Sequence, residues 1–260
     1  MLRWISRGCQ MFRLLQFKPP HGWRAVVWEL AIVTLGVLIA LAAQQLVSTV
    51  NDRSIANETR RDVTDELNDG LASVALRDMA EPCIDRRLSE LRQLFVTWAT
   101  SGSFSTPQWV AQTPIVEITL PRYDAALSSG RITLLTGEEQ YRIGAVVEGL
   151  RRFDQLQRDE RLIWGRLRAL QAGSEALSSG DKTMLIGALQ DASAMNYETK
   201  IAARQVIPMA SGFGYAADFR RVRAMAGRVW TSGKYTPSIC TPIDTPRELA
   251  NRTQVVPLPF

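Results

Sequence analysis

Residues 23–47, WRAVVWELAIVTLGVLIALAAQQLV, decide the fold of this chain of 260 residues because they form a long apolar segment. A hydrocarbon core about 30 Å thick is crossed by roughly 20 residues of mostly apolar helix. The segment is long enough, although the acidic Glu29 interrupts it, and Trp23 and Trp28 suit the aromatic belt at a membrane interface. We therefore predict a single N-terminal transmembrane helix over residues 23–50.

The charge of the chain gives this helix a direction. Residues 1–24 hold five basic side chains and no acidic one, which accounts for the net charge of +5: Arg3, Arg7, Arg13, Lys18 and Arg24. The positive-inside rule then keeps the amino terminus in the cytoplasm and carries the rest of the chain across the membrane. We predict a cytoplasmic basic leader over residues 1–22, which either lies on the inner leaflet as a short amphipathic helix or is partly disordered. We also predict membrane lipid as a partner, a bacterial inner-membrane location, a periplasmic remainder and no nucleic-acid partner.

A cleaved signal peptide is the alternative interpretation of the same segment. Ala40-Leu41-Ala42, before Ala43, resembles the small-residue site of signal peptidase. The long basic region, the acid inside the segment and the helix-compatible sequence beyond it favour an anchor. In both interpretations residues 51–260 are exported.

The three cysteines agree with an exported domain. Cys9 falls in the leader, whereas Cys83 and Cys240 fall together on the side where disulfides persist. We predict a bridge between Cys83 and Cys240, and the alternative is two unrelated free thiols.

Apolar residues at three- and four-residue steps predict that the exported part is mainly α, a helical bundle over residues 51–230. A helix over 54–80 continues the span or stacks on it, Glu81-Pro82 separates it from a helix over 83–100, and the two form an antiparallel hairpin. Residues 101–121 are rich in loop signals. Later helices are predicted over 123–127, from a capping box of Thr136 and Glu139 to residue 170, from 181 to about 206 before Pro208, and over 216–230. Residues 231–260 form a proline-rich tail.

Three stretches carry a family resemblance: the span itself, EPCIDRRLSEL at residues 81–91, and YDAALSSGRITLLTGEEQYRIGAVVEGLRRFDQLQRDE at residues 123–160. Together they resemble an uncharacterised bacterial family of single-pass membrane proteins that carries only a domain-of-unknown-function label. The resemblance implies a membrane location and a helical domain. It implies no activity and no catalytic residues.

Catalytic and cofactor signatures are missing from the sequence. The one histidine, His21, lies in the leader, so the exported part has none for a Ser-His-Asp triad or a histidine metal site. No phosphate-binding glycine loop and no C-x-x-C motif is present. We predict no catalytic residue, no metal and no cofactor. Four acids at helical spacings leave a carboxylate enzyme open, although a solvated face explains them as well: Asp62, Asp65, Glu66 and Asp69.

Three residues of the span are candidates for contact with a partner. Glu29 is an ionisable group inside the apolar segment, so it faces another helix, pairs with Arg24 or reaches the interface. Gly36 and Ala40 form a small-x-x-x-small pair that lets two spans approach closely, either two copies of this chain or this chain and another membrane protein.

Arginines mark a further candidate site in the exported part. Two groups on separate predicted helices either line an anion pocket or make surface salt bridges with interleaved acids: Arg86, Arg87 and Arg92, and Arg151, Arg152, Arg158 and Arg161.

These observations favour a non-catalytic interaction or scaffold module. A ligand-binding sensor that signals through a partner is the second hypothesis, and a carboxylate-based membrane-anchored enzyme is the third.

Overall fold

The computed structural model describes residues 22–110, 115–218, 220, 222 and 239–246. This described part is mainly helical, as predicted, with five α-helices, three short 3₁₀ helices and no strand. The chain divides into two compact units, Met1–Ile55 and Ala56–Phe260. The predicted leader, most of the predicted helix over 216–230 and most of the tail over 231–260 lie outside the described residues.

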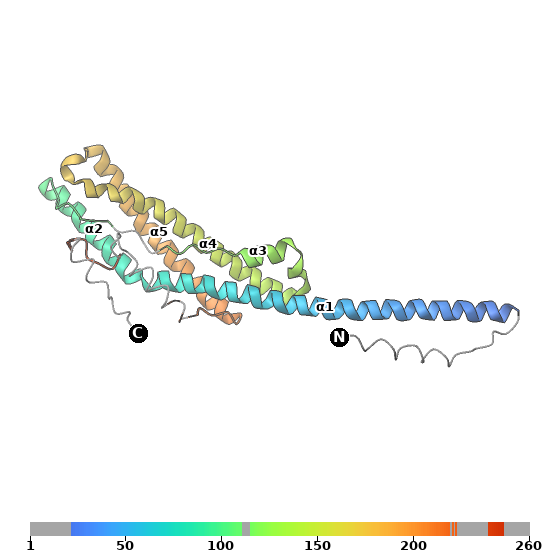
Figure 1. The fold of residues 1–260 in the computed structure, drawn as a ribbon. Coiled ribbons are helices and arrows are strands. Elements are labelled where there is room, and N and C mark those ends of the chain that lie inside the picture. Colours follow the sequence, from blue (N-terminus) through green and yellow to red (C-terminus); the bar gives the residue numbers. More distant parts are fainter. Residues whose placement is uncertain (1–21, 111–114, 219, 221, 223–238, 247–260) are drawn as a thin grey trace, which may run out of the picture. The chain divides into compact units, whose positions relative to one another are not determined.

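Helix α1 (Trp23–Met79) contains the apolar segment and continues into the second unit (Figure 1). Its apolar window is long and apolar enough to cross a membrane, and none of the window is buried. A soluble protein normally hides so many large apolar side chains from water. The first unit therefore has the composition of a membrane span.

Helices α1 and α2 (Glu81–Ser101) do not form the predicted antiparallel hairpin, so this prediction is wrong. Ala80, between them, keeps right-handed helical dihedrals (φ −81°, ψ −9°), and the N–H of Ile84 still donates to its carbonyl at 3.1 Å. Pro82 removes one N–H from the first turn of α2, which interrupts the helix without reversing the chain. Helix α2 runs on from the end of α1 and packs on α5 (Figure 1).

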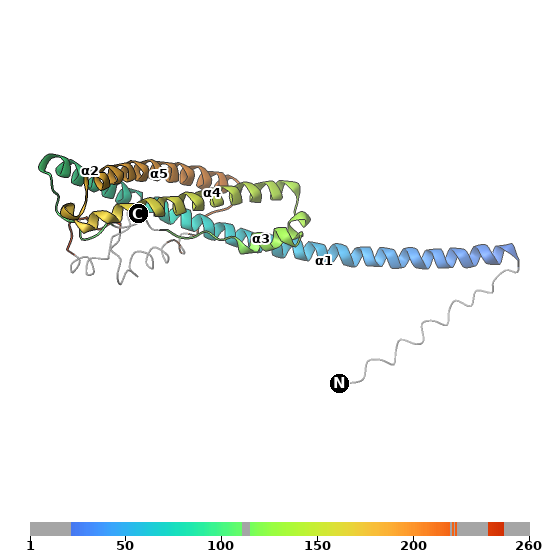
Figure 2. The ribbon, with the colours of Figure 1, turned by 90° about the horizontal axis from the view of Figure 1, so that it is seen from above.

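The hairpin of this unit is formed instead by α4 (Gly137–Leu167) and α5 (Ser179–Gly212). They lie side by side in both views, joined by η2 (Arg168–Ala172) and η3 (Ser174–Ala176) (Figures 1 and 2). The predicted capping box at the start of α4 is confirmed: the N–H of Glu139 donates to Thr136 Oγ1 at 3.3 Å, and the N–H of Thr136 donates to Glu139 Oε2 at 2.9 Å. The two helices approach closely, because a Cβ on Gly149 would lie 2.6 Å from Val206 Cγ2.

Helix α5 continues past the predicted end near residue 206 and includes Pro208. Proline costs one backbone hydrogen bond within a helix. Val206 and Ala210, on either side of Pro208, are both buried in the core, and their packing holds the last turn in helical form.

The core of the second unit consists mainly of two hydrophobic clusters. The α3 cluster joins α1, the start of α4 and the end of α5 to the segment that carries α3 (Pro121–Ser128) and η1 (Arg131–Leu134). The α2 cluster joins α2 to the end of α4, the start of α5 and two residues near the carboxyl end, Ile239 and Cys240.

Candidate ligand-binding cleft beside the disulfide

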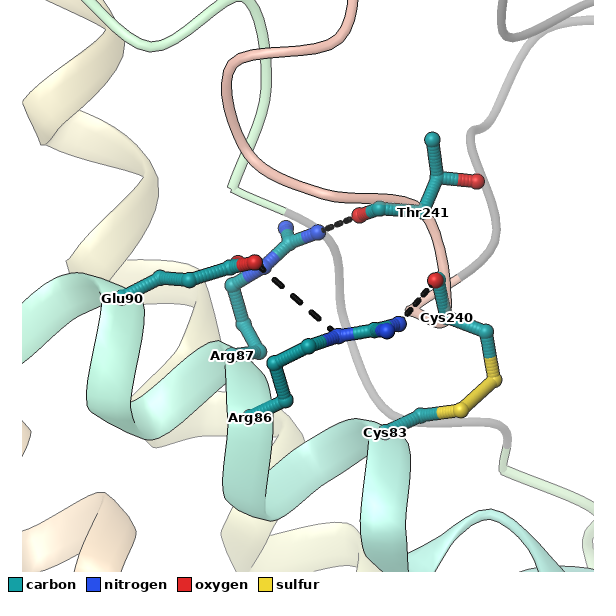
Figure 3. The surroundings of a disulfide bond; sticks show 6 residues. All are labelled: Cys83, Arg86, Arg87, Glu90, Cys240 and Thr241. Atoms are coloured by element: carbon teal, nitrogen blue, oxygen red, sulfur yellow. Dashed lines mark hydrogen bonds and ion pairs between the residues drawn. A yellow bond between two sulfur atoms is a disulfide. The ribbon is translucent and has the colours of Figure 1, made fainter.

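A disulfide joins Cys83, in the first turn of α2, to Cys240 (Figure 3). Their Cα atoms lie 4.6 Å apart although the residues are 157 positions apart in the sequence. This is the pair that the topology argument predicts. We call residues 239–246, which the bridge fastens to α2, the strap.

Two arginines of α2 hold the strap beside the bridge. Arg86 donates from Nη2 to the carbonyl of Cys240, and Arg87 donates from Nη2 to the carbonyl of Thr241 (Figure 3). Both arginines follow Cys83 by about one helical turn, so they lie on the same face of α2 as the bridge. The strap is therefore fixed by one covalent bond and two charge-assisted hydrogen bonds.

Glu90 offsets part of the charge of this arginine pair. Its Oε2 accepts from Arg87 Nε at 2.8 Å, and its Oε1 lies 4.0 Å from Arg86 Nε. The side chain of Arg87 is fully buried. Burial lowers the pKa of Arg87, while the carboxylates of Glu90 and Asp244 act in the opposite direction.

A cleft of about 790 Å³ opens next to the strap. One wall is a polar stripe on α2, where residues recur every three or four positions and so share a face. The second wall is the loop that follows α2, and the third is the strap. The lining residues are Arg86, Ser89, Glu90, Gln93, Leu94 and Thr97 from α2, Phe104, Ser105, Thr106, Pro107 and Gln108 from the loop, and Pro242, Ile243 and Asp244 from the strap.

The lining of this cleft is suited to recognition by hydrogen bonds. Its volume falls within the range of about 300–1,000 Å³ that is usual for ligand sites. Most of its polar groups are uncharged amides and hydroxyls, and no hydrogen bond joins a lining hydroxyl to a lining carboxylate among the described residues. The described part also holds no cluster of three residues that could bind a metal ion.

The structure places the predicted span residues in the first unit. Glu29, Gly36 and Ala40 are all exposed on α1. Glu29 forms no ion pair with Arg24 or with any other residue that the structure describes. A Cβ on Gly36 would meet nothing within 4 Å, so the small-residue face of α1 is open.

The two groups of arginines do not form a common anion pocket. Arg86 and Arg87 hold the strap, whereas Arg151 pairs with Asp124 and Arg158 pairs with Asp154. The alternative of ordinary salt bridges therefore describes Arg151 and Arg158. It does not describe the buried Arg87.

A buried polar layer near the junction of α1 and α2 is absent from the sequence-based candidates. Arg77, only 2% exposed, donates to Glu81 Oε2 at 2.9 Å, to Glu160 Oε1 at 2.9 Å and to Asn196 Oδ1 at 2.7 Å. Lys200 lies 3.2 Å from Glu81 Oε1 at the rim of the layer. Glu160 is one of the acids interleaved with the arginines of α4, for which the sequence predicts ordinary surface salt bridges, and this is wrong for Glu160 because its side chain is fully buried.

Glu66 is a second acid that sequence reasoning placed on a solvated face. It is 8% exposed, and its two carboxylate oxygens accept from the backbone N–H groups of Arg122 and Tyr123, each at 2.8 Å. These N–H groups belong to the first turn of α3, which has no side-chain cap from its own N-cap residue. Glu66 therefore caps α3 from another helix and satisfies two N–H groups that the first turn of a helix leaves without a partner.

Comparison with known proteins found no matching family model, no matching curated protein and no matching solved structure.

Proposed function

We propose that this protein is a bitopic inner-membrane protein whose helical domain lies in the periplasm and acts by binding rather than by catalysis. The observation that carries the proposal is the apolar window of α1, which is long enough for a bilayer and entirely unburied. The basic residues before it support a cytoplasmic amino terminus under the positive-inside rule.

The Cys83–Cys240 pair supports an exported domain. Disulfides form and persist in oxidising compartments such as the periplasm and are rare in the cytosol. The disulfide also fastens the strap, which forms one wall of the cleft. A binding role follows from a cleft lined by hydrogen-bonding groups on a covalently fastened frame.

In-cell crosslinking of the full-length protein, followed by solubilisation, affinity purification and mass spectrometry, tests the proposal. We expect reproducible recovery of an envelope protein that is lost when the strap is released by Cys240→Ser. Recovery of cytosolic partners alone would contradict the periplasmic placement. Recovery of the protein itself and nothing else would indicate that its partner is a second copy of this chain.

Thiol counting tests the topology separately. A mass-tagged maleimide should find one free thiol, Cys9, in the unfolded but unreduced protein and three after reduction. Three free thiols before reduction would contradict both the bridge and the oxidising compartment. Loss of the Cys9 tag from mature protein would favour the cleaved signal peptide over the anchor.

Ligand sensing is the second candidate function, because the cleft has the volume of a ligand site. A sensor would transmit ligand binding to a partner protein. It predicts a ligand-dependent rise in the melting temperature of the full-length protein, following mass-action linkage.

A further inference from the structure

We propose that the cleft beside the strap binds an extended peptide segment of another protein. The proposal rests on the binding role proposed above and names the chemistry of the partner at this site. Three features of the cleft support it: the length of the stripe on α2, the kinds of polar groups along it and the charges at the strap end.

The length of the polar stripe matches a short extended peptide. The stripe runs from Arg86 to Thr97 on α2, and eleven helical steps of about 1.5 Å span about 16 Å. An extended peptide rises about 3.3 Å per residue, so about five residues fit along it. A small compact ligand would leave most of the stripe unused.

The polar groups along the stripe match a peptide backbone. Gln93 on α2 and Gln108 on the facing loop each carry both a donor and an acceptor, as a peptide unit does. Leu94, Pro242 and Ile243 supply apolar surface between them for side chains of the ligand.

The same lining is less suited to a saccharide. Sugar rings are typically recognised by an aromatic face, and Phe104 is the one aromatic residue that lines the cleft. The rings of Phe104 and Trp98 pack edge to face with centroids 4.9 Å apart, and Phe104 is only 8% exposed. Little of the Phe104 ring is therefore available for a sugar to stack on.

Charge at the strap end selects the ligand further. The carboxylate of Glu90 is held by Arg87, and Arg86 is held by the carbonyl of Cys240. Asp244 on the strap is exposed and contributes a negative charge to this end. The two positive charges of Arg86 and Arg87 and the two negative charges of Glu90 and Asp244 sum to zero at this end, so a peptide without a strong net charge is favoured.

A random heptapeptide library displayed on phage and panned on the full-length protein in nanodiscs tests this proposal. We expect enriched peptides that carry little net charge and whose affinity falls at least tenfold in Gln93→Met, which keeps the side-chain length but removes the amide. Gln190→Met, an exposed glutamine of α5 outside the cleft, is the matched control and should leave the affinity unchanged.

Three outcomes would overturn the proposal. They are the absence of enriched peptides, peptides that bind Gln93→Met as well as the unchanged protein, and a melting-temperature rise with chitotriose that Gln93→Met abolishes. The panning needs no cellular location, so its failure alongside successful in-cell crosslinking would reject the peptide cleft while keeping the binding role. Success in panning together with recovery of cytosolic partners alone in cells would keep the peptide cleft and reject the proposed location.

Discussion

The α3 cluster and the α2 cluster close their ends of the domain in different ways. At the α3 end, Glu66 on α1 caps α3 with two hydrogen bonds of 2.8 Å, and apolar packing and exposed ion pairs complete the contacts. At the α2 end, a strap that comes from 157 residues further along the chain is fastened by a disulfide. Reduction should therefore lower the stability of the α2 end of the domain and leave the stability of the α3 end unchanged.

The buried layer around Arg77 lies near the junction of α1 and α2, and its loss has the largest expected effect. Arg77→Ala leaves Glu160 buried without its cation, and removing one partner of a buried ion pair costs about 3–5 kcal/mol. Chemical denaturation monitored by circular dichroism measures this free energy of unfolding. Arg151→Ala removes an exposed pair and should cost less than about 1 kcal/mol. Equal losses for both variants would contradict a structural role for the layer.

Loss of the disulfide should separate the two clusters in stability. The double variant Cys83→Ser/Cys240→Ser should lower the free energy of unfolding by about 2–4 kcal/mol, because the bridge closes a long loop in the unfolded chain. Hydrogen exchange should then rise in α2 and stay nearly unchanged in α3. A uniform rise across both helices would show that the two ends unfold as one cooperative unit.

The sequence predicts local features of this fold and misses the long-range ones. The capping box of Thr136 and Glu139 depends on four neighbouring residues, and a second box of Ser178 and Asp181 at the start of α5 was missed although it has a similar signal. The disulfide prediction rests on the exported location expected for both Cys83 and Cys240, and on the location of Cys9 in the leader.

Contacts between distant residues have no comparable signal in one sequence. Arg77 meets Glu160 across 83 residues and Asn196 across 119, and Glu66 reaches α3 across 56. Each of these charged residues has neighbours of opposite charge in the sequence. Its local sequence therefore resembles that of an exposed residue in a surface salt bridge. The cleft shares this property, because the strap that forms one wall is far along the chain from α2 and the loop that form the other two.

A smaller effect on the free energy of unfolding is expected in the α3 cluster, where α4 and α5 approach each other closely. Gly149→Ala places a methyl group about 2.6 Å from Val206 Cγ2 and should cost about 1–3 kcal/mol through overpacking. Gly144→Ala, in the same helix with nothing within 4 Å of its Cβ, should stabilise the protein by up to about 1 kcal/mol. Thermal unfolding of the two variants measures the difference, and shifts of the same sign would contradict the close approach.

The smallest expected effect is a pH dependence at the start of α4. Arg60 and Thr136 hold the pKa of Glu139 down to about 2 from 4.5, so this carboxylate stabilises the fold above pH 4.5 and loses that contribution as the pH falls towards 2. Because water screens this partly exposed pair, the contribution should be below about 1 kcal/mol.

Glu139→Gln keeps the geometry of the capping box and removes the charge. Urea unfolding at several pH values should show a shallower loss of stability between pH 4.5 and 2 in this variant. An unchanged slope would assign the acid sensitivity to other carboxylates.

The covalent ring closed by Cys83 and Cys240 also changes how the domain answers a mechanical pull. A force applied between α1 and the carboxyl terminus passes through the bridge, so the residues inside the ring carry no tension while it is intact. At about 3.4 Å per residue, roughly 500 Å of chain stays hidden from extension. Cutting the bridge would release that slack in a single-molecule stretching trace, whereas the oxidised protein would reach its full extension much earlier.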